Sequence, residues 1–91
     1  MTQEERIEEL CDELKSLLIR KNRDYDDSFS KQFAKYGVLS GLIRIDDKIN
    51  RLHSLTEGGR KDSVGESLID TCIDAAGYFL LTAVELNKKT E

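Results

Sequence analysis

Apolar residues recur at three- and four-residue steps in three stretches of the chain, the spacing of one face of an α-helix. The first stretch follows a capping box, Thr2-Gln3-Glu4-Glu5, in which a hydroxyl and a carboxylate satisfy free amides of the first turn. Ile7, Leu10 and Leu14 continue the apolar face, with acidic residues on the other side. We expect this helix to end near Lys21.

The second stretch predicts a helix from about Val38 to Leu55, ended by the glycine pair at 58–59. Its apolar stripe consists of Val38, Leu42, Ile45, Ile49 and Leu52. The third stretch follows another capping box, Ser63-Val64-Gly65-Glu66, and predicts a helix from about Ser63 to Asn87. Its apolar face consists of Leu68, Cys72, Ala75, Ala76, Phe79, Ala83 and Leu86.

Between the first two long helices, residues 22–37 lose this periodicity, and only a short helix over Ser30 to Lys35 is expected. This segment holds four of the six aromatic rings, so a part of the fold must receive them. We therefore predict an all-α fold for a single domain, residues 1–91. A chain this small leaves an apolar face open, so we expect a helical bundle completed in a homodimer or higher homo-oligomer.

Composition agrees with this fold, since 35% of the residues are charged and proline is absent. The net charge of −4 and the lack of a basic run argue against duplex nucleic acid as a partner. No stretch is apolar enough for export or a membrane, so we expect a cytoplasmic protein. Cys11 and Cys72 lie in apolar helical patterns, and we expect them to be reduced core residues.

One face of the second long helix is charged. Arg44, Asp47, Lys48 and Arg51 fall at offsets of zero, three, four and seven and so share one side. A solvated face with intrahelical ion pairs is the plainer interpretation of this pattern. The alternative is a binding surface in which the basic residues contact phosphate.

The third long helix carries Glu66, Asp70 and Asp74 four residues apart, which places three carboxylates in a line. A divalent cation would relieve their repulsion, and oxygen ligands favour Mg²⁺ or Mn²⁺. Alternatively, these acids cap the helix and interact with its dipole. Tyr25, with acidic residues around it, either lines a base or sugar pocket or closes the end of the bundle.

Both helices together would suit phosphate chemistry, with carboxylates holding Mg²⁺ on phosphate oxygens and with Lys48 and Arg51 offsetting phosphate charge. One acid could then act as general base on a metal-activated water. The only histidine is His53, and no signature pairs it with a nucleophile.

Three segments together resemble the phage and prophage nucleotide-modification-associated domain family. They are Lys21-Asn22-Arg23-Asp24-Tyr25, then Arg44-Ile45-Asp46-Asp47-Lys48-Ile49-Asn50-Arg51-Leu52, then Glu66-Ser67-Leu68-Ile69-Asp70-Thr71 with Asp74. The likeness covers roughly Leu18 to Leu86. The family is in turn similar to the all-α nucleoside triphosphate pyrophosphohydrolases of the MazG and dimeric dUTPase group, in which acids from two helices bind magnesium.

The resemblance implies metal ligands among Asp47, Glu66, Asp70 and Asp74, with Asp47, Glu66 and Asp70 as the catalytic acids. It implies that Lys48 and Arg51, with Arg44, contact substrate, and that Tyr25 lies near the nucleotide. Two departures stand out. Asp26 replaces the family's usual glycine, and Asp46-Asp47 with Asn50 stands where the pyrophosphohydrolases carry paired glutamates.

Three functions follow as hypotheses. The first is a magnesium-dependent hydrolase of the α–β phosphoanhydride of a nucleoside triphosphate. The second is a phage protein that binds or sequesters a nucleotide without turnover. The third is an interaction module whose charged helix face docks on a host protein.

Overall fold

The computed structural model describes residues 1–57 and 64–88, and of residues 64–67 only the backbone. Four helices form nearly all of this part and no strand occurs in it: α1 (Gln3–Asp24), α2 (Ser28–Tyr36), α3 (Val38–Glu57) and α4 (Val64–Lys88). The prediction of an all-α fold with three long helices and a short one is confirmed. No helix in the described ranges has the length and apolar character needed to cross a membrane.

The first capping box forms as predicted. The Glu5 amide donates to Thr2 Oγ1 at 3.1 Å, and the Thr2 amide donates to Glu5 Oε1 at 2.9 Å. The glycine pair at 58–59 lies outside the described residues. So do Ser63 and the Glu66 side chain, on which the second capping box depends. Helix α1 runs three residues past the expected end at Lys21, and α2 begins two residues before Ser30.

Two aspartates form the turn between α1 and α2. Asp26 and Asp27 have φ angles of 52° and 56°, a left-handed conformation that glycine adopts more easily. Asn22 Nδ2 donates to Asp27 Oδ1, and Lys31 pairs with Asp26 at 2.8 Å. Both interactions are made by the turn residues, and aspartate tolerates this left-handed conformation, although less readily than glycine.

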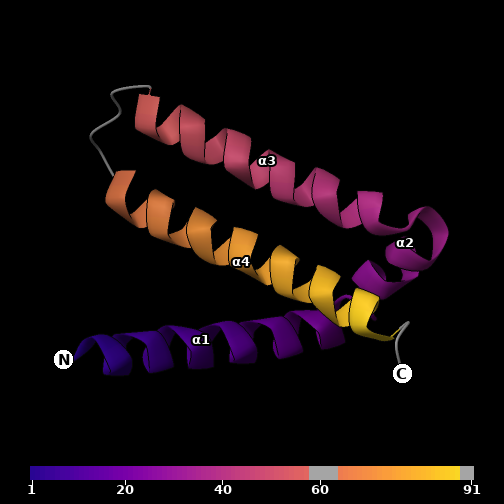
Figure 1. Cartoon of the computed structure of the whole chain (residues 1–91), viewed down its shortest axis with the longest axis horizontal. Coiled ribbons are helices and arrows are strands. Elements are labelled where there is room, and N and C mark those ends of the chain that lie inside the picture. Colours follow the sequence, from indigo (N-terminus) through magenta and orange to yellow (C-terminus); the bar gives the residue numbers. More distant parts are fainter. Residues whose placement is uncertain (58–63, 89–91) are drawn as a thin grey trace.

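Helix α4 lies between α1 and α3, as Figure 1 shows, and it runs antiparallel to α3. Small residues permit the close packing on both sides. A Cβ added at Gly41 would lie 3.3 Å from Thr82 Cγ2, and one at Gly77 would lie 3.1 Å from Leu18 Cδ2. These two glycines therefore set how closely α3 and α1 approach α4.

Helix α2 crosses the end of this layer and attaches to α4 through polar contacts. Ser30 Oγ donates to Glu85 Oε2 at 2.8 Å, and Lys88 Nζ donates to the same oxygen at 2.7 Å. Burial acts to raise the pKa of Glu85, but the hydrogen bonds from Lys88 and Ser30 outweigh it, so the pKa is lowered. The Glu85 side chain is 10% exposed, less than any other side chain that forms an ion pair in the described ranges, although Lys88 is 55% exposed.

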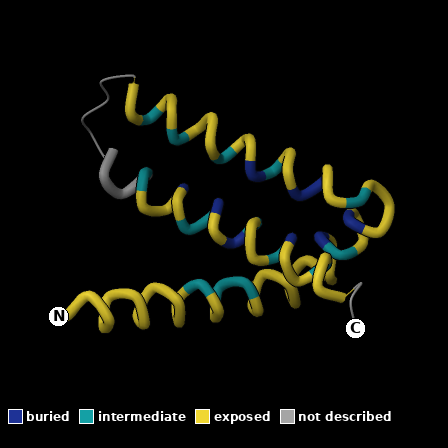
Figure 2. The backbone as a smooth tube through the Cα atoms, in the orientation of Figure 1, coloured by how far each residue is buried: buried dark blue, intermediate teal, exposed yellow. Residues whose placement is uncertain are grey.

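The core is thin. Among the described residues the buried hydrophobic side chains are Phe29, Phe33, Ile45 and Ala75. Figure 2 shows how few positions are buried and that they lie mainly where α2, α3 and α4 meet. Two of the four aromatic residues in 22–37, Phe29 and Phe33, are therefore buried in this core, and their ring centroids lie 6.4 Å apart.

Several side chains that the periodicity assigned to the interior are exposed. Leu42 and Phe79 are 48% and 56% exposed, and Cys11 and Cys72 are also exposed. The expectation that the cysteines are core residues is therefore wrong. Helical spacing identifies the apolar face of a helix, but a face is buried only where another helix packs on it. In the described part of the chain these positions remain exposed.

Candidate functional site in a cavity among the four helices

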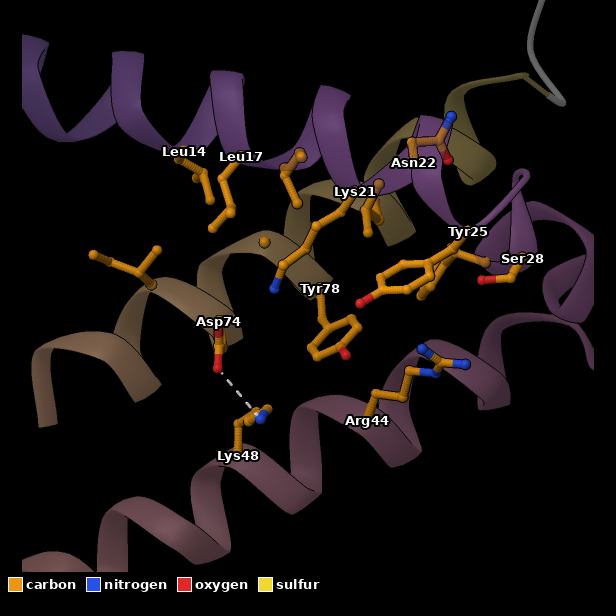
Figure 3. Close-up of a pocket in the computed structure, with 15 residues that line it drawn as sticks. Leu14, Leu17, Lys21, Asn22, Tyr25, Ser28, Arg44, Lys48, Asp74 and Tyr78 are labelled. Atoms are coloured by element: carbon orange, nitrogen blue, oxygen red, sulfur yellow. Dashed lines mark ion pairs between the residues drawn. The ribbon is translucent and has the colours of Figure 1, made fainter. Parts of the chain in front are cut away.

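A cavity of about 230 Å³ lies where α1, α3 and α4 meet the start of α2. Figure 3 shows the side chains that surround it. Its wall is apolar toward the middle of α1 and polar toward the end of the bundle. The lining residues are Leu14, Leu17, Leu18, Lys21, Asn22, Tyr25, Ser28, Phe29, Arg44, Lys48, Ile73, Asp74, Gly77, Tyr78 and Leu81.

Three cationic side chains line the cavity: Lys21 from α1 and Arg44 and Lys48 from α3. The Arg44 guanidinium carbon lies 5.7 Å from the centre of the Phe29 ring and 5.6 Å from that of Tyr78, within the range of a cation–π interaction. Its Nη2 also donates to Gln32 Oε1. The guanidinium is thus held in place with N–H groups left for a ligand.

Lys48 and Asp74 form an ion pair beside the cavity, with Nζ and Oδ2 3.4 Å apart. Their side chains are 27% and 36% exposed, so the pair is partly shielded from solvent. The pair joins α3 to α4, and its distance is longer than that of a tight charge-assisted hydrogen bond. A phosphate could therefore compete with Asp74 for the ammonium group.

Aromatic and small polar side chains form the rest of the polar wall. The Phe29 and Tyr78 rings stack, with centroids 6.3 Å apart and planes inclined by 26°. Tyr25 and Tyr78 both extend toward the space between α1 and α3 (Figure 3). Asn22 and Ser28 add hydrogen-bonding groups on the same side. This wall can stack on a planar ring and bond to its polar edge.

A second, more open hollow lies next to the cavity and shares Leu17, Ile73 and Asp74 with it. Its polar lining is mostly acidic. The other residues that line this hollow are Asp12, Glu13, Ser16, Arg20 and Asp70. Within the described part of the chain, no three His, Cys, Asp or Glu side chains are close enough together to hold a metal ion.

The structure brings some of the sequence-predicted site residues together and separates others. Tyr25, Arg44, Lys48 and Asp74 line the cavity, and Asp70 lines the neighbouring hollow. Asp47 and Arg51 are exposed and line neither. The Glu66 side chain is not among those described.

The charged face expected on α3 is therefore divided. Arg44 and Lys48 line the cavity, whereas Asp47 points farther around the helix and Arg51 lies farther along it, away from α2, and both are exposed. Residues three or four positions apart share one side of a helix, but a neighbouring helix can cover one of them and leave the next exposed. Asp46 is exposed as well.

Sequence reasoning missed four polar residues of the cavity: Lys21, Asn22, Ser28 and Tyr78. Lys21 and Asn22 belong to the segment that carries the family resemblance, so a signal existed for them. Tyr78 lies four residues after Asp74, one turn along the same face, and that spacing could have indicated it. Ser28 gave no signal before the turn geometry was known.

No curated protein and no solved structure is significantly similar to the chain. One family model matches residues 21–86, a range that includes α2, α3 and all of α4 except its last two residues. It also includes Lys21 and Asn22 of α1 and Tyr25, which caps the end of that helix. The chain therefore belongs to the family described as Nucleotide modification associated domain 1, which points to a role in nucleotide metabolism.

Proposed function

We propose that the chain binds a nucleotide in the cavity among its four helices. The observation that carries this proposal is the combination of three cations with two tyrosines around one space of about 230 Å³. A nucleotide has an anionic phosphate end and a planar base, and the cavity wall offers a matching group for each. Membership in a nucleotide-modification-associated family supports the same ligand class.

The phosphates belong beside Arg44 and Lys48. The Arg44 guanidinium can donate two parallel hydrogen bonds to phosphate oxygens, and the Lys48 ammonium adds a compact positive charge one turn away. Lys21 projects from α1 into the same space (Figure 3). Together these three residues can offset much of the charge of a di- or triphosphate.

The base and sugar belong toward the α1–α2 turn. Tyr25 is 64% exposed, so its ring is accessible for stacking, and Tyr78 presents a second ring from α4. Asn22 and Ser28 can bond to polar atoms of the sugar or of the base edge. This end of the cavity would give the ligand its orientation.

Magnesium-dependent hydrolysis is a second candidate function, and the position of Asp74 favours it. Asp74 lines both the cationic cavity and the acidic hollow, with Asp70 one turn away. Mg²⁺ keeps several waters and is usually held by one or two carboxylates plus substrate phosphates. A nucleotide could therefore bring the ion with it, and a three-carboxylate protein site is not required.

In that reaction a water attacks the α-phosphorus and the α–β phosphoanhydride breaks, which yields a nucleoside monophosphate and pyrophosphate. A carboxylate must act as general base and accept a proton from the attacking water, and Asp70 is our candidate because it lines the hollow beside Asp74. This activity is the one that the resemblance to MazG-like pyrophosphohydrolases implies. It would depend on Mg²⁺ or Mn²⁺.

The test is calorimetric titration with nucleoside mono-, di- and triphosphates, with and without Mg²⁺, followed by chromatography of the same samples. Binding that strengthens with phosphate number supports the cavity proposal. Release of pyrophosphate, abolished in Asp70→Asn, supports the hydrolase. Binding without turnover leaves sequestration as the function, and the absence of binding to every nucleotide contradicts the proposal and favours a protein partner.

A further inference from the structure

An exposed apolar stripe runs along α4 on the side away from the cavity. Its members repeat at alternating steps of three and four residues, the a and d pattern of a coiled coil, and all are exposed. They are Ile69, Cys72, Ala76, Phe79, Ala83 and Leu86. At about 100° per residue, Asp74 lies roughly 160° around the helix from Ala76, so the stripe and the cavity face opposite ways.

Helix α3 extends this apolar surface. Leu42 and Ile49 lie on the side of the buried Ile45 opposite to Lys48, and they are 48% and 39% exposed. No Asp, Glu, Lys or Arg belongs to the α4 stripe, although charged residues make up 35% of the chain. An uncharged surface of this length is uncommon on a monomer and is typical of an interface.

The chain is also less compact than a monomer of its size. Its accessible surface is 6991 Å², whereas a folded monomer of 10.4 kDa exposes about 5,400 Å². The radius of gyration is 14.9 Å, against about 12 Å for a compact domain of this length. The difference in area exceeds the roughly 800 Å² that each partner buries in a stable dimer.

We propose that a second copy of the chain covers this stripe, with the two α4 helices antiparallel about a twofold axis between Ala76 and Phe79. That arrangement places Phe79 of each copy against the small Ala76 of the other. It places Cys72 opposite Ala83 and Ile69 opposite Leu86. Each large side chain then meets a small or aliphatic one, and the same pairing serves both copies, as a twofold interface requires.

This inference is independent of the proposed function. The cavity residues Asp74 and Tyr78 lie on the other side of α4, so the stripe would be buried whether or not a nucleotide binds. A self-complementary stripe with no charge also explains why the occupant is a copy of the chain. An unrelated acidic or basic partner would find no countercharge on it.

Sedimentation equilibrium of the full chain tests the stoichiometry. We expect a dimer, and we expect Phe79→Glu to raise its dissociation constant at least about thirtyfold, as loss of a central hot spot does. The matched control is Ile43→Glu, since Ile43 is 54% exposed but lies roughly 160° around α3 from Ile45. That variant should remain dimeric.

If Phe79→Glu fails to fold, the wild-type chain still gives an answer. A dimer whose folded state needs the second copy has a Tm that rises with protein concentration, and a monomer does not. A folded wild-type monomer at high concentration would overturn the proposal. So would a dimer that Ile43→Glu dissociates and Phe79→Glu leaves intact.

Thiol cross-linking tests the antiparallel register in a Cys11→Ser background. Ala83→Cys should form a disulfide-linked dimer under mild oxidation, because the introduced thiol would face Cys72 of the partner subunit. Within one chain the two positions are eleven residues, or about 16 Å, apart on a helix and cannot join. Cross-linking without the Ala83 substitution would show Cys72 facing its own copy and would overturn the antiparallel arrangement.

Discussion

Lys48 on α3 and Asp74 on α4 form an ion pair of 3.4 Å that borders both the cavity and the acidic hollow. A partly exposed pair of this length contributes little to stability. Its position matters more, because it keeps an ammonium group beside the cavity and a carboxylate beside the hollow. A phosphate and its magnesium ion could each take one of the two partners.

Neutralising Lys48 should weaken nucleotide binding, since its ammonium group lines the cavity. We expect Lys48→Met to raise the Kd for a nucleoside triphosphate about tenfold or more, the effect of losing one charge-assisted hydrogen bond. Arg51→Met removes the same charge from the same helix outside the cavity, and its Kd should change little. Equal losses in the two variants would show that α3 acts only through its overall charge.

Asp74→Asn should have opposite effects with and without magnesium. Without Mg²⁺ the substitution frees Lys48 from its partner and should tighten triphosphate binding a few-fold. With Mg²⁺ it removes the proposed metal ligand, so the gain in affinity that we expect from Mg²⁺ should disappear. Asp47→Asn, in an exposed position outside both hollows, should retain that gain. Titration calorimetry of the three proteins at two magnesium concentrations measures both effects.

Removing the Tyr25 ring should weaken binding through lost stacking. We expect Tyr25→Ala to raise the nucleotide Kd about five- to a hundredfold, the range found for a base stacked on an aromatic ring. Tyr36→Ala is the control, because Tyr36 is similarly exposed at 67% but does not line the cavity. If Tyr25→Ala binds as the wild type does, the base lies elsewhere.

The Glu85 contact should make stability depend on acid pH. Because the folded-state pKa of Glu85 is lowered, its contribution is present above the unfolded value near 4.5 and is lost as pH falls through the folded value. Glu85→Gln should lower the free energy of unfolding by about 1 kcal/mol at pH 7. In urea denaturation the difference between the two proteins should shrink as pH falls below 4.5 and vanish below the lowered folded-state pKa of Glu85. A difference that stays constant with pH would contradict this assignment.

Replacing Asp26 by glycine should stabilise the chain. Asp26 has a φ of 52°, and the pair that it forms with Lys31 is exposed and contributes little. We expect Asp26→Gly to raise Tm by about 2 to 5 °C, because glycine adopts the left-handed conformation without strain. Asp26→Ala keeps the strain, loses the ion pair and should lower Tm. Thermal unfolding followed by circular dichroism compares the three proteins.

Local signals in the sequence determined the helices. Apolar spacing located the three long helices, and the Thr2 capping box placed the first helix start at the correct residue. Side chains three or four residues apart interact within one helix, so neither signal needs tertiary contacts. The family resemblance likewise depended on short segments, and it pointed to Tyr25, Lys48 and Asp74 as site residues before any geometry was known.

Tertiary structure alone decided which face of each helix is covered. Lys48 and Arg51 share a face by spacing, yet only Lys48 lines the cavity, because the cavity lies toward the α2 end of α3 and Arg51 is three residues farther from that end. Phe79 and Ile45 have equivalent apolar patterns, yet only Ile45 is buried. Apolar periodicity predicts which face of a helix can be buried. Whether that face is buried depends on where a neighbouring helix lies, and contacts between residues distant in sequence, such as Gly41 with Thr82, set that position.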